Sequence, residues 1–294
     1  MKARTIAAAT FIAAFQSLTP TPDGHACASC LTGDPTLIAF GAERPYPNRL
    51  RLALESRTRS DDIGTGSVRI ILSEVRTELG LAWAPSSDLF LQVAVPLIYR
   101  DATYGDSGTD RLLATGDLGL RARLHLTRGV AVSAGLSMPT APALTRTHYG
   151  STRELPHEAQ PGSGSFDPSL GLALTHATHP HAISVSTWGT WPTGDSNPSL
   201  QLAAHYQYEL WRERRHALSF RLALESRLDG KAYDHGEPVA DSGGFIAFLG
   251  GDVLVTPAPD WLLTLGLRVP VIEALDGAHD EGIFGVLSLA YDIL

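Results

Sequence analysis

Hydrophobic and polar residues alternate along most of the chain after residue 48. In segment 50–57, leucines occupy every second position up to 54, and the positions facing the other way include Arg51, Glu55 and Arg57. An extended strand separates leucines from charges onto two faces, whereas a helix would spread the charges around its circumference. The string RLALESR at 51–57 recurs unchanged at 221–227 with the same alternation. Both copies therefore predict β-strands with one apolar and one charged face.

Ten further segments follow this period of two, and turn-forming residues bound each of them. The clearest is GDLGLRARLHL at 116–126, in which Leu and Ala alternate with Asp, Arg and His. With the two RLALESR strands, the sequence predicts twelve strands, and no amphipathic helix competes after residue 26. The ten segments are 68–83, 89–100, 114–127, 130–138, 167–175, 182–190, 199–211, 244–256, 261–271 and 283–294.

The connections between these strands alternate in length. Short ones at 84–88, 127–129, 176–181, 212–215 and 257–260 separate longer ones at 60–67, 101–113, 139–166, 191–198, 229–243 and 272–282. Bacterial outer-membrane barrels have short periplasmic turns and longer external loops, and an even strand number returns both termini to the periplasm. The sequence therefore predicts an all-β protein, an antiparallel up-and-down transmembrane β-barrel of about twelve strands over 49–294. The connection 139–166 either folds into this barrel or covers it outside.

Hydrocarbon lipid provides no hydrogen-bond partners, so a sheet can cross it only when closed. The leucine faces then contact lipid, and the charged faces line the lumen. One interpretation is a polar pore whose field acts on solutes; the other is a set of Arg–Glu pairs that neutralise one another and fill a narrow barrel. The predicted lumen residues are Arg51, Glu55, Arg57, Glu74, Arg76, Glu78, Arg121, Arg123, His125, Arg221, Glu225, Arg227 and Arg268.

Large aromatic residues fall at or near the ends of predicted strands. Trp and Tyr concentrate where a barrel meets the two membrane surfaces. The predicted membrane-interface aromatics are Trp83, Tyr99, Trp191, Trp211, Trp261 and Tyr291.

The first residues have the pattern of an export signal. Lys2 and Arg4 precede an apolar stretch at 6–15, and the small-x-small sequence ending at Ala26 suits cleavage. We expect a signal peptide at 1–26, an N-terminal periplasmic segment at 27–48 and a barrel at 49–294. The location is then the outer membrane of a Gram-negative-type bacterium. We expect a monomer that meets the insertion machinery and the lipid bilayer, while the net charge of -8 argues against nucleic acid.

The two cysteines, Cys27 and Cys30, form a C-x-x-C motif just after the predicted cleavage site. A local disulfide is favoured in an oxidising compartment, and metal binding or lipid attachment at Cys27 are the alternatives. Covalent haem would need His where Leu31 stands, so no cofactor is expected. The other metal candidate is a group of histidines in one connection, for which a solvated turn is the favoured interpretation: His176, His179 and His181.

Several segments in order resemble the outer-membrane channel proteins grouped under the meta-cleavage pathway of phenol degradation. They are VPLIYR (95–100), GDLGLRARLHL (116–126), VAVSAGLSMPT (130–140) and GGFIAFLGGDVLVTPAPDWLLTLGLRVPVIEAL (243–275), followed by a final strand. The resemblance covers most of 49–294 and implies a barrel that passes small molecules, including hydrophobic or aromatic ones. It transfers no functional residue to this chain.

Two alternatives to a channel remain. An outer-membrane hydrolase of phospholipase type needs Ser and His on the outer wall, whereas His125 and His205 have inward positions and no Ser–His pair at matching depth is evident. The G-x-S-x-G elbow is absent as well. The second alternative is a closed structural barrel whose C-x-x-C segment docks a partner or binds metal. We expect a small-molecule channel that is not an enzyme.

Overall fold

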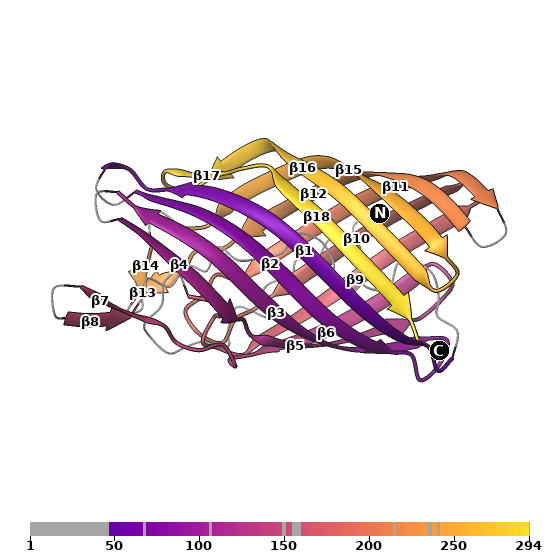
Figure 1. Cartoon of the computed structure of the whole chain (residues 1–294), viewed down its shortest axis with the longest axis horizontal. Helices are drawn as coiled ribbons and strands as arrows, with labels where there is room; N and C mark the ends of the chain where they lie inside the picture. Colours follow the sequence, from indigo (N-terminus) through magenta and orange to yellow (C-terminus); the bar gives the residue numbers. More distant parts are fainter. Residues whose placement is uncertain are drawn as a thin grey trace, which may run out of the picture.

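Fourteen strands pair in one antiparallel sheet that closes on itself (Figure 1). The computed structural model describes residues 47–66, 69–105, 108–148, 151–154, 160–213, 216–234, 237–239 and 242–293. Strand β1 (Leu50–Ile63) pairs with β2 (Ile70–Trp83) on one side and with β18 (Phe284–Asp292) on the other, which closes the barrel. In the described part of the chain, no helix has the length and apolarity needed to span a bilayer.

The remaining strands of the wall follow in sequence order. They are β3 (Leu89–Tyr104), β4 (Gly108–Thr115), β5 (Leu118–His125), β6 (Val130–Met138), β9 (Asp167–Thr178), β10 (His181–Thr190), β11 (Ser199–Glu213), β12 (His216–Asp229), β15 (Gly244–Ala258), β16 (Trp261–Leu275) and β17 (His279–Glu281). Two small hairpins lie in longer connections at one end of the barrel: β7 (Thr145–His148) with β8 (Ser151–Glu154), and β13 (Tyr233–Asp234) with β14 (Glu237–Pro238). Of the two, β7–β8 projects from the barrel (Figure 1).

Two positions of the wall are each shared by two collinear strands. Strands β4 and β5 both pair with β3 and are separated only at Gly116 and Asp117. Strands β17 and β18 both pair with β1 and are separated at Gly282 and Ile283. When each collinear pair is counted as one strand, the barrel wall has twelve strand positions, which confirms the predicted architecture.

Strand boundaries agree best with the sequence pattern at the short turns. Strand β6 has the predicted limits, whereas β1, β3 and β16 run about four residues beyond theirs toward the long connections. The extra residues include charged pairs such as Asp101 with Arg111. Polar residues continue a hairpin ladder once it has begun, but their sequence lacks the apolar alternation that marks a strand.

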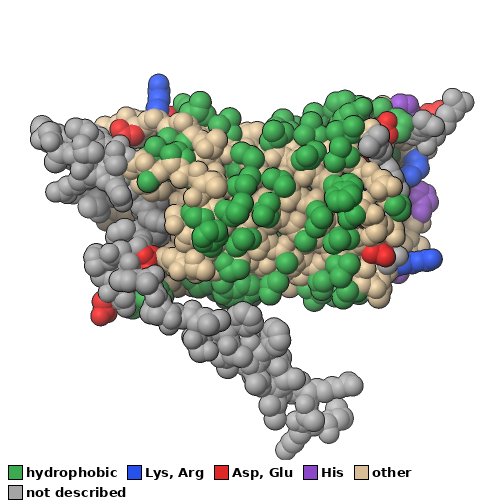
Figure 2. Space-filling model, turned by 90° about the horizontal axis from the view of Figure 1, so that it is seen from below, with side chains coloured by type: hydrophobic (Ala, Val, Ile, Leu, Met, Phe, Trp, Pro, Cys, Tyr) green, Lys and Arg blue, Asp and Glu red, His purple; other side chains and the backbone are tan. Residues whose placement is uncertain are grey.

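The burial pattern is the reverse of that in a soluble sandwich. Leu222 and Leu224 in β12 are exposed, whereas Glu225 and Arg227 in the same strand are buried. Figure 2 shows hydrophobic side chains spread over the waist of the barrel and charged or histidine side chains near its ends. The apolar surface faces outward and the ions face inward, as a closed sheet in lipid requires.

The first and last described residues meet at the end that carries the short turns. The backbone N–H of Ile293 donates to the carbonyl of Leu50 (2.8 Å), and Arg49 pairs with Asp292 (2.5 Å). The longer connections and both small hairpins lie at the opposite end (Figure 1).

Candidate functional site: the barrel interior

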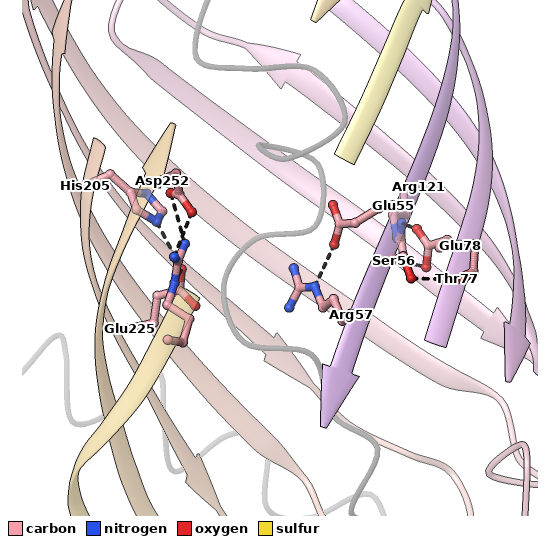
Figure 3. Close-up of polar contacts among 10 residues, drawn as sticks. Glu55, Ser56, Arg57, Thr77, Glu78, Arg121, His205, Glu225 and Asp252 are labelled. Carbon is pink, nitrogen blue, oxygen red and sulfur yellow. Dashed lines mark hydrogen bonds and ion pairs between the residues drawn. The ribbon is translucent and has the colours of Figure 1, made fainter. Parts of the chain in front are cut away.

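Ion pairs cover one part of the inner wall, which we call the charged wall and define as the inward faces of β12, β15, β16, β17, β18, β1, β2, β3 and β5. One group joins Arg57 Nε to Glu55 (2.6 Å) and Arg121 Nη1 to Glu78 (2.5 Å). Figure 3 shows it facing a second group across the interior. The second group lies on β12, β15 and β16. In this group the guanidinium of Arg268 donates to two carboxylates, those of Glu225 (2.9 Å) and Asp252 (2.7 Å).

The two copies of RLALESR have the same facing but different partners. In the first copy, Arg51 donates to Asp292 (2.7 Å), a residue of the adjacent last strand. In the second copy, Arg221 donates to Asp252 (2.6 Å) on β15 and Arg227 to Asp229 (2.6 Å) on its own strand. In both copies the repeated string therefore gives a strand with an apolar outer face and a charged inner face. The residues around each copy provide different counter-ions for its arginines.

Other predicted lumen residues are also enclosed. Glu74 pairs with Arg100, which also donates to the backbone carbonyl of Gln160 (3.1 Å). Arg123 is 1% exposed, and the ring of His125 lies 6.1 Å from that of Phe90. The predicted charges thus lie inside, and most of them fill space and neutralise one another.

Arg76 differs from these residues. It lies directly opposite Arg57 in the β1–β2 pairing, and Glu78 beside it is bound by Arg121. Among the described residues it has no ion-pair partner, and its buried Nε has no hydrogen-bond partner.

The rest of the inner wall has almost no charge. We call it the small-residue wall and define it as the inward faces of β6, β9, β10 and β11. Its side chains are mostly Ser, Gly and Ala, and they leave volume that long side chains would fill. Buried members are Ala131, Ser133, Ser169, Ala173, Ser186, Trp188, Ser199, Gln201 and Ala203.

A cavity of about 160 Å³ lies against the small-residue wall. Three predicted lumen residues line it from the other side, namely Arg76, Glu78 and Arg121. Its further lining includes Ser137, Ser169, Trp188, Thr190, Asn197 and Gln201, which the sequence analysis did not single out. Strand alternation already shows serines and glycines on the inward side of 130–138, and that signal points to open volume.

Part of the long connection 139–166 enters the interior. The backbone N–H of Ser163 donates to Asp117 (2.7 Å), and that of Ala141 donates to the other oxygen of the same carboxylate (3.0 Å). Pro161 is buried and lines the cavity. Hairpin β7–β8 projects from the barrel end instead (Figure 1). One part of this connection thus folds into the barrel, and another part lies outside it.

No protein-family model matches the chain, and neither does any of the curated proteins compared with it. Solved structures do match. An outer-membrane channel from Pseudomonas putida F1 superposes with a TM-score of 0.64 at 14% identity, over 89% of this chain and 100% of that one. The β domain of the Bordetella autotransporter BrkA superposes with a TM-score of 0.55 at 10% identity, over 84% and 100%. The fold is that of an outer-membrane β-barrel.

One expectation about histidine was wrong. The sequence showed no Ser–His pair at matching depth, yet Ser184 Oγ lies 3.5 Å from His205 Nδ1, and His205 Nε2 lies 3.3 Å from Glu225. The pair escaped notice because cross-strand register is not visible in one sequence. Glu225 also accepts from Arg268, and the group faces inward, away from a lipid substrate.

The predicted histidine connection is shorter than 176–181, because β9 ends at Thr178 and β10 begins at His181. His181 Nδ1 lies 2.7 Å from the Tyr206 hydroxyl, and His179 Nδ1 lies 3.5 Å from Glu209. These two histidines therefore have separate partners. Cys27 and Cys30 lie outside the described residues.

A second group of metal-ligand types lies near the long connections. Asp61, His279 and Glu281 bring one ligand atom each within 4.8 Å of one another. Arg59 pairs with Asp61 (2.5 Å) and Arg227 pairs with Glu281. These cations already neutralise both carboxylates, so the group belongs to the ion pairs of the charged wall.

The predicted interface aromatics lie at both ends of the barrel. Trp261 and Tyr291 are direct cross-strand neighbours near the short turns, with ring centroids 4.6 Å apart. Trp83 and Trp211 are exposed at the same end, and Trp191 is exposed at the opposite end of β10. The remaining one, Tyr99, is exposed but lies five residues inside β3, because that strand is longer than predicted.

Proposed function

We propose that this protein is an outer-membrane channel for small molecules, and that solutes pass along the small-residue wall. The observation that carries the proposal is the cavity of about 160 Å³ between that wall and Arg76. A barrel whose only task was structural would gain packing energy from large side chains there. The outer-membrane channel of similar fold supports the same function.

The charged wall narrows this channel. Apart from Arg76, its arginines and carboxylates are mostly paired, so they fill the remaining interior without a strong net field. In this proposal they set the width of the path, and solute contacts come from the uncharged side. The signal peptide at 1–26, the segment 27–48, the periplasmic termini and the monomeric state are parts of the same proposal.

Conductance in planar bilayers tests the proposal. The purified protein should give stepwise currents, and Ser137→Phe should reduce the unit conductance, because residue 137 lines the cavity. Ser73→Phe is the matched control, since Ser73 is exposed on the outer face of β2, and it should leave the conductance unchanged. Silent membranes, or equal conductance in both variants, would contradict the proposal.

A closed structural barrel is the second candidate, and the tightly paired charged wall favours it. It predicts silent membranes for wild type and variants alike. The bilayer measurement therefore separates the two candidates, provided that heat-dependent gel migration first shows a folded barrel.

A further inference from the structure

Trp188 lies flat against the inner wall because two neighbouring positions are glycine. It is the direct cross-strand partner of Gly171 on β9, and Gly135 on β6 lies one strand further. A Cβ built on Gly171 would approach Trp188 Cε3 to 2.5 Å, and one on Gly135 would approach Cζ2 to 3.2 Å. The benzo ring therefore covers both glycines, and Trp188, which is 5% exposed, is also part of the lining of the cavity.

Unpartnered polar atoms surround the same cavity. Among the described residues, no hydrogen-bond partner exists for Gln201 Oε1, Asn197 Oδ1, Ser196 Oγ or Arg76 Nε, although all four atoms are buried. Gln201 is the cross-strand neighbour of Trp188 on its other side. Buried polar atoms in native proteins are nearly always hydrogen-bonded. Four such atoms around one cavity, three of them acceptors, indicate a ligand that brings several hydroxyl groups.

Charge and size narrow the ligand class. The charged residues of the lining are two arginines, Arg76 and Arg121, and three carboxylates, Glu78, Asp117 and Asp167, so charges of both signs nearly balance and the lining requires no strong net charge in a ligand. The cavity of about 160 Å³ is close to the roughly 150 Å³ of a protein cavity that holds one benzene ring. A purely apolar ring would fit this volume but would leave the polar atoms without partners.

We propose that this cavity is a binding subsite for a neutral, hydroxyl-rich single ring of monosaccharide size. The C–H face of the ring stacks on Trp188, and its hydroxyl groups donate to Gln201, Asn197 and Ser196 while Arg76 donates to a ring or hydroxyl oxygen. The proposal rests on the channel function and specifies the solute class that pauses within the path.

Calorimetry on the full-length protein in detergent, with D-glucose as the probe, tests the subsite directly. We expect binding that Trp188→Leu weakens by roughly tenfold, because the stacking face is lost. Trp188→Phe keeps an aromatic face and should retain most of the affinity. Trp191→Leu is the control, since Trp191 is exposed beyond the end of the same strand and does not line the cavity.

Gln201→Leu provides a second test that leaves the indole in place, and it should also weaken glucose binding. Heat-dependent gel migration shows which variants fold, so a misfolded Trp188→Leu leaves Gln201→Leu as the deciding variant. Absence of glucose binding, or equal binding by all variants, would overturn the subsite, as would binding of phenol in preference to glucose.

Conductance distinguishes failure of the subsite from failure of the channel. Stepwise currents without glucose binding would leave the channel standing and remove the subsite. Glucose binding without currents would support the subsite and remove the channel. If both hold, glucose should reduce the current in a concentration-dependent manner in wild type and much less in Trp188→Leu.

Discussion

Leu222 and Arg221 are neighbours in β12, yet their side chains meet opposite surroundings. Leu222 is 63% exposed on the outer face, where lipid replaces water in a membrane. Arg221 points inward and pairs with Asp252 at 2.6 Å. The direction of a side chain relative to the wall therefore decides what a substitution does. The position of the side chain along the barrel axis decides how large the effect on stability is.

Leu222→Arg should destabilise the membrane-inserted barrel by roughly 2–4 kcal/mol, because residue 222 lies midway along β12 and a guanidinium there faces hydrocarbon. Leu126→Arg is the matched control. Leu126 is equally apolar and exposed, but it lies beside the short turn 127–129 and should lose only about 0–1 kcal/mol. Denaturant unfolding in lipid vesicles measures both values. Equal losses would contradict the assigned depth of these positions.

At the scale of strands, alternation alone predicted the twelve strand positions of the wall and which RLALESR side chains point inward or outward. Alternation succeeded because the wall is a single sheet, in which each side chain points either outward or into the lumen. It could not show that β4 and β5 are separate strands at one position of the wall. The outward residues change from odd-numbered in β4 to even-numbered in β5, and the polar residues Arg111 and Thr115 on the outward side of β4 conceal that change. Nor could it show the inward segment 160–165, which depends on contacts between residues far apart in sequence.

Asp117 joins this break to the segment that enters the lumen. Its carboxylate accepts from the backbone of Ala141 and of Ser163, so one side chain holds both ends of the connection. Asp117→Ala should release the segment, raise the unit conductance and speed amide exchange at 160–165. Asp62→Ala is the control, because Asp62 pairs with the exposed Arg69 at the same end of the barrel. Unchanged exchange in Asp117→Ala would show that other contacts hold the segment.

At the scale of the whole molecule, the interior has a charged side and a small-residue side. Periodicity predicted the charged side because Arg and Glu stand out among leucines. The small-residue side was missed because the serines and glycines that alternation places on the inward side of 130–138 indicate open volume only once the other strands are known to close around them. Trp188 then becomes significant, since only closure shows which cavity it lines.

Closure itself rests on one seam, where the first strand meets the last. Leu54 on β1 is the direct partner of Leu289 on β18, and both face outward, whereas Leu263 on β16 is one strand further in the same row. Directly opposed residues have Cα atoms about 4.5–5.5 Å apart, which suits a disulfide. Residues two strands apart are separated by roughly 9.5 Å, which does not.

In a background with Cys27 and Cys30 changed to Ser, the pair Leu54→Cys and Leu289→Cys should therefore form a disulfide during assembly in the membrane. Denatured, non-reduced protein would migrate as a faster, looped chain, and reduction would restore the slower band. The pair Leu54→Cys and Leu263→Cys should stay reduced. A disulfide in the second pair but not in the first would mean that β1 closes the barrel against β16 and not against β18.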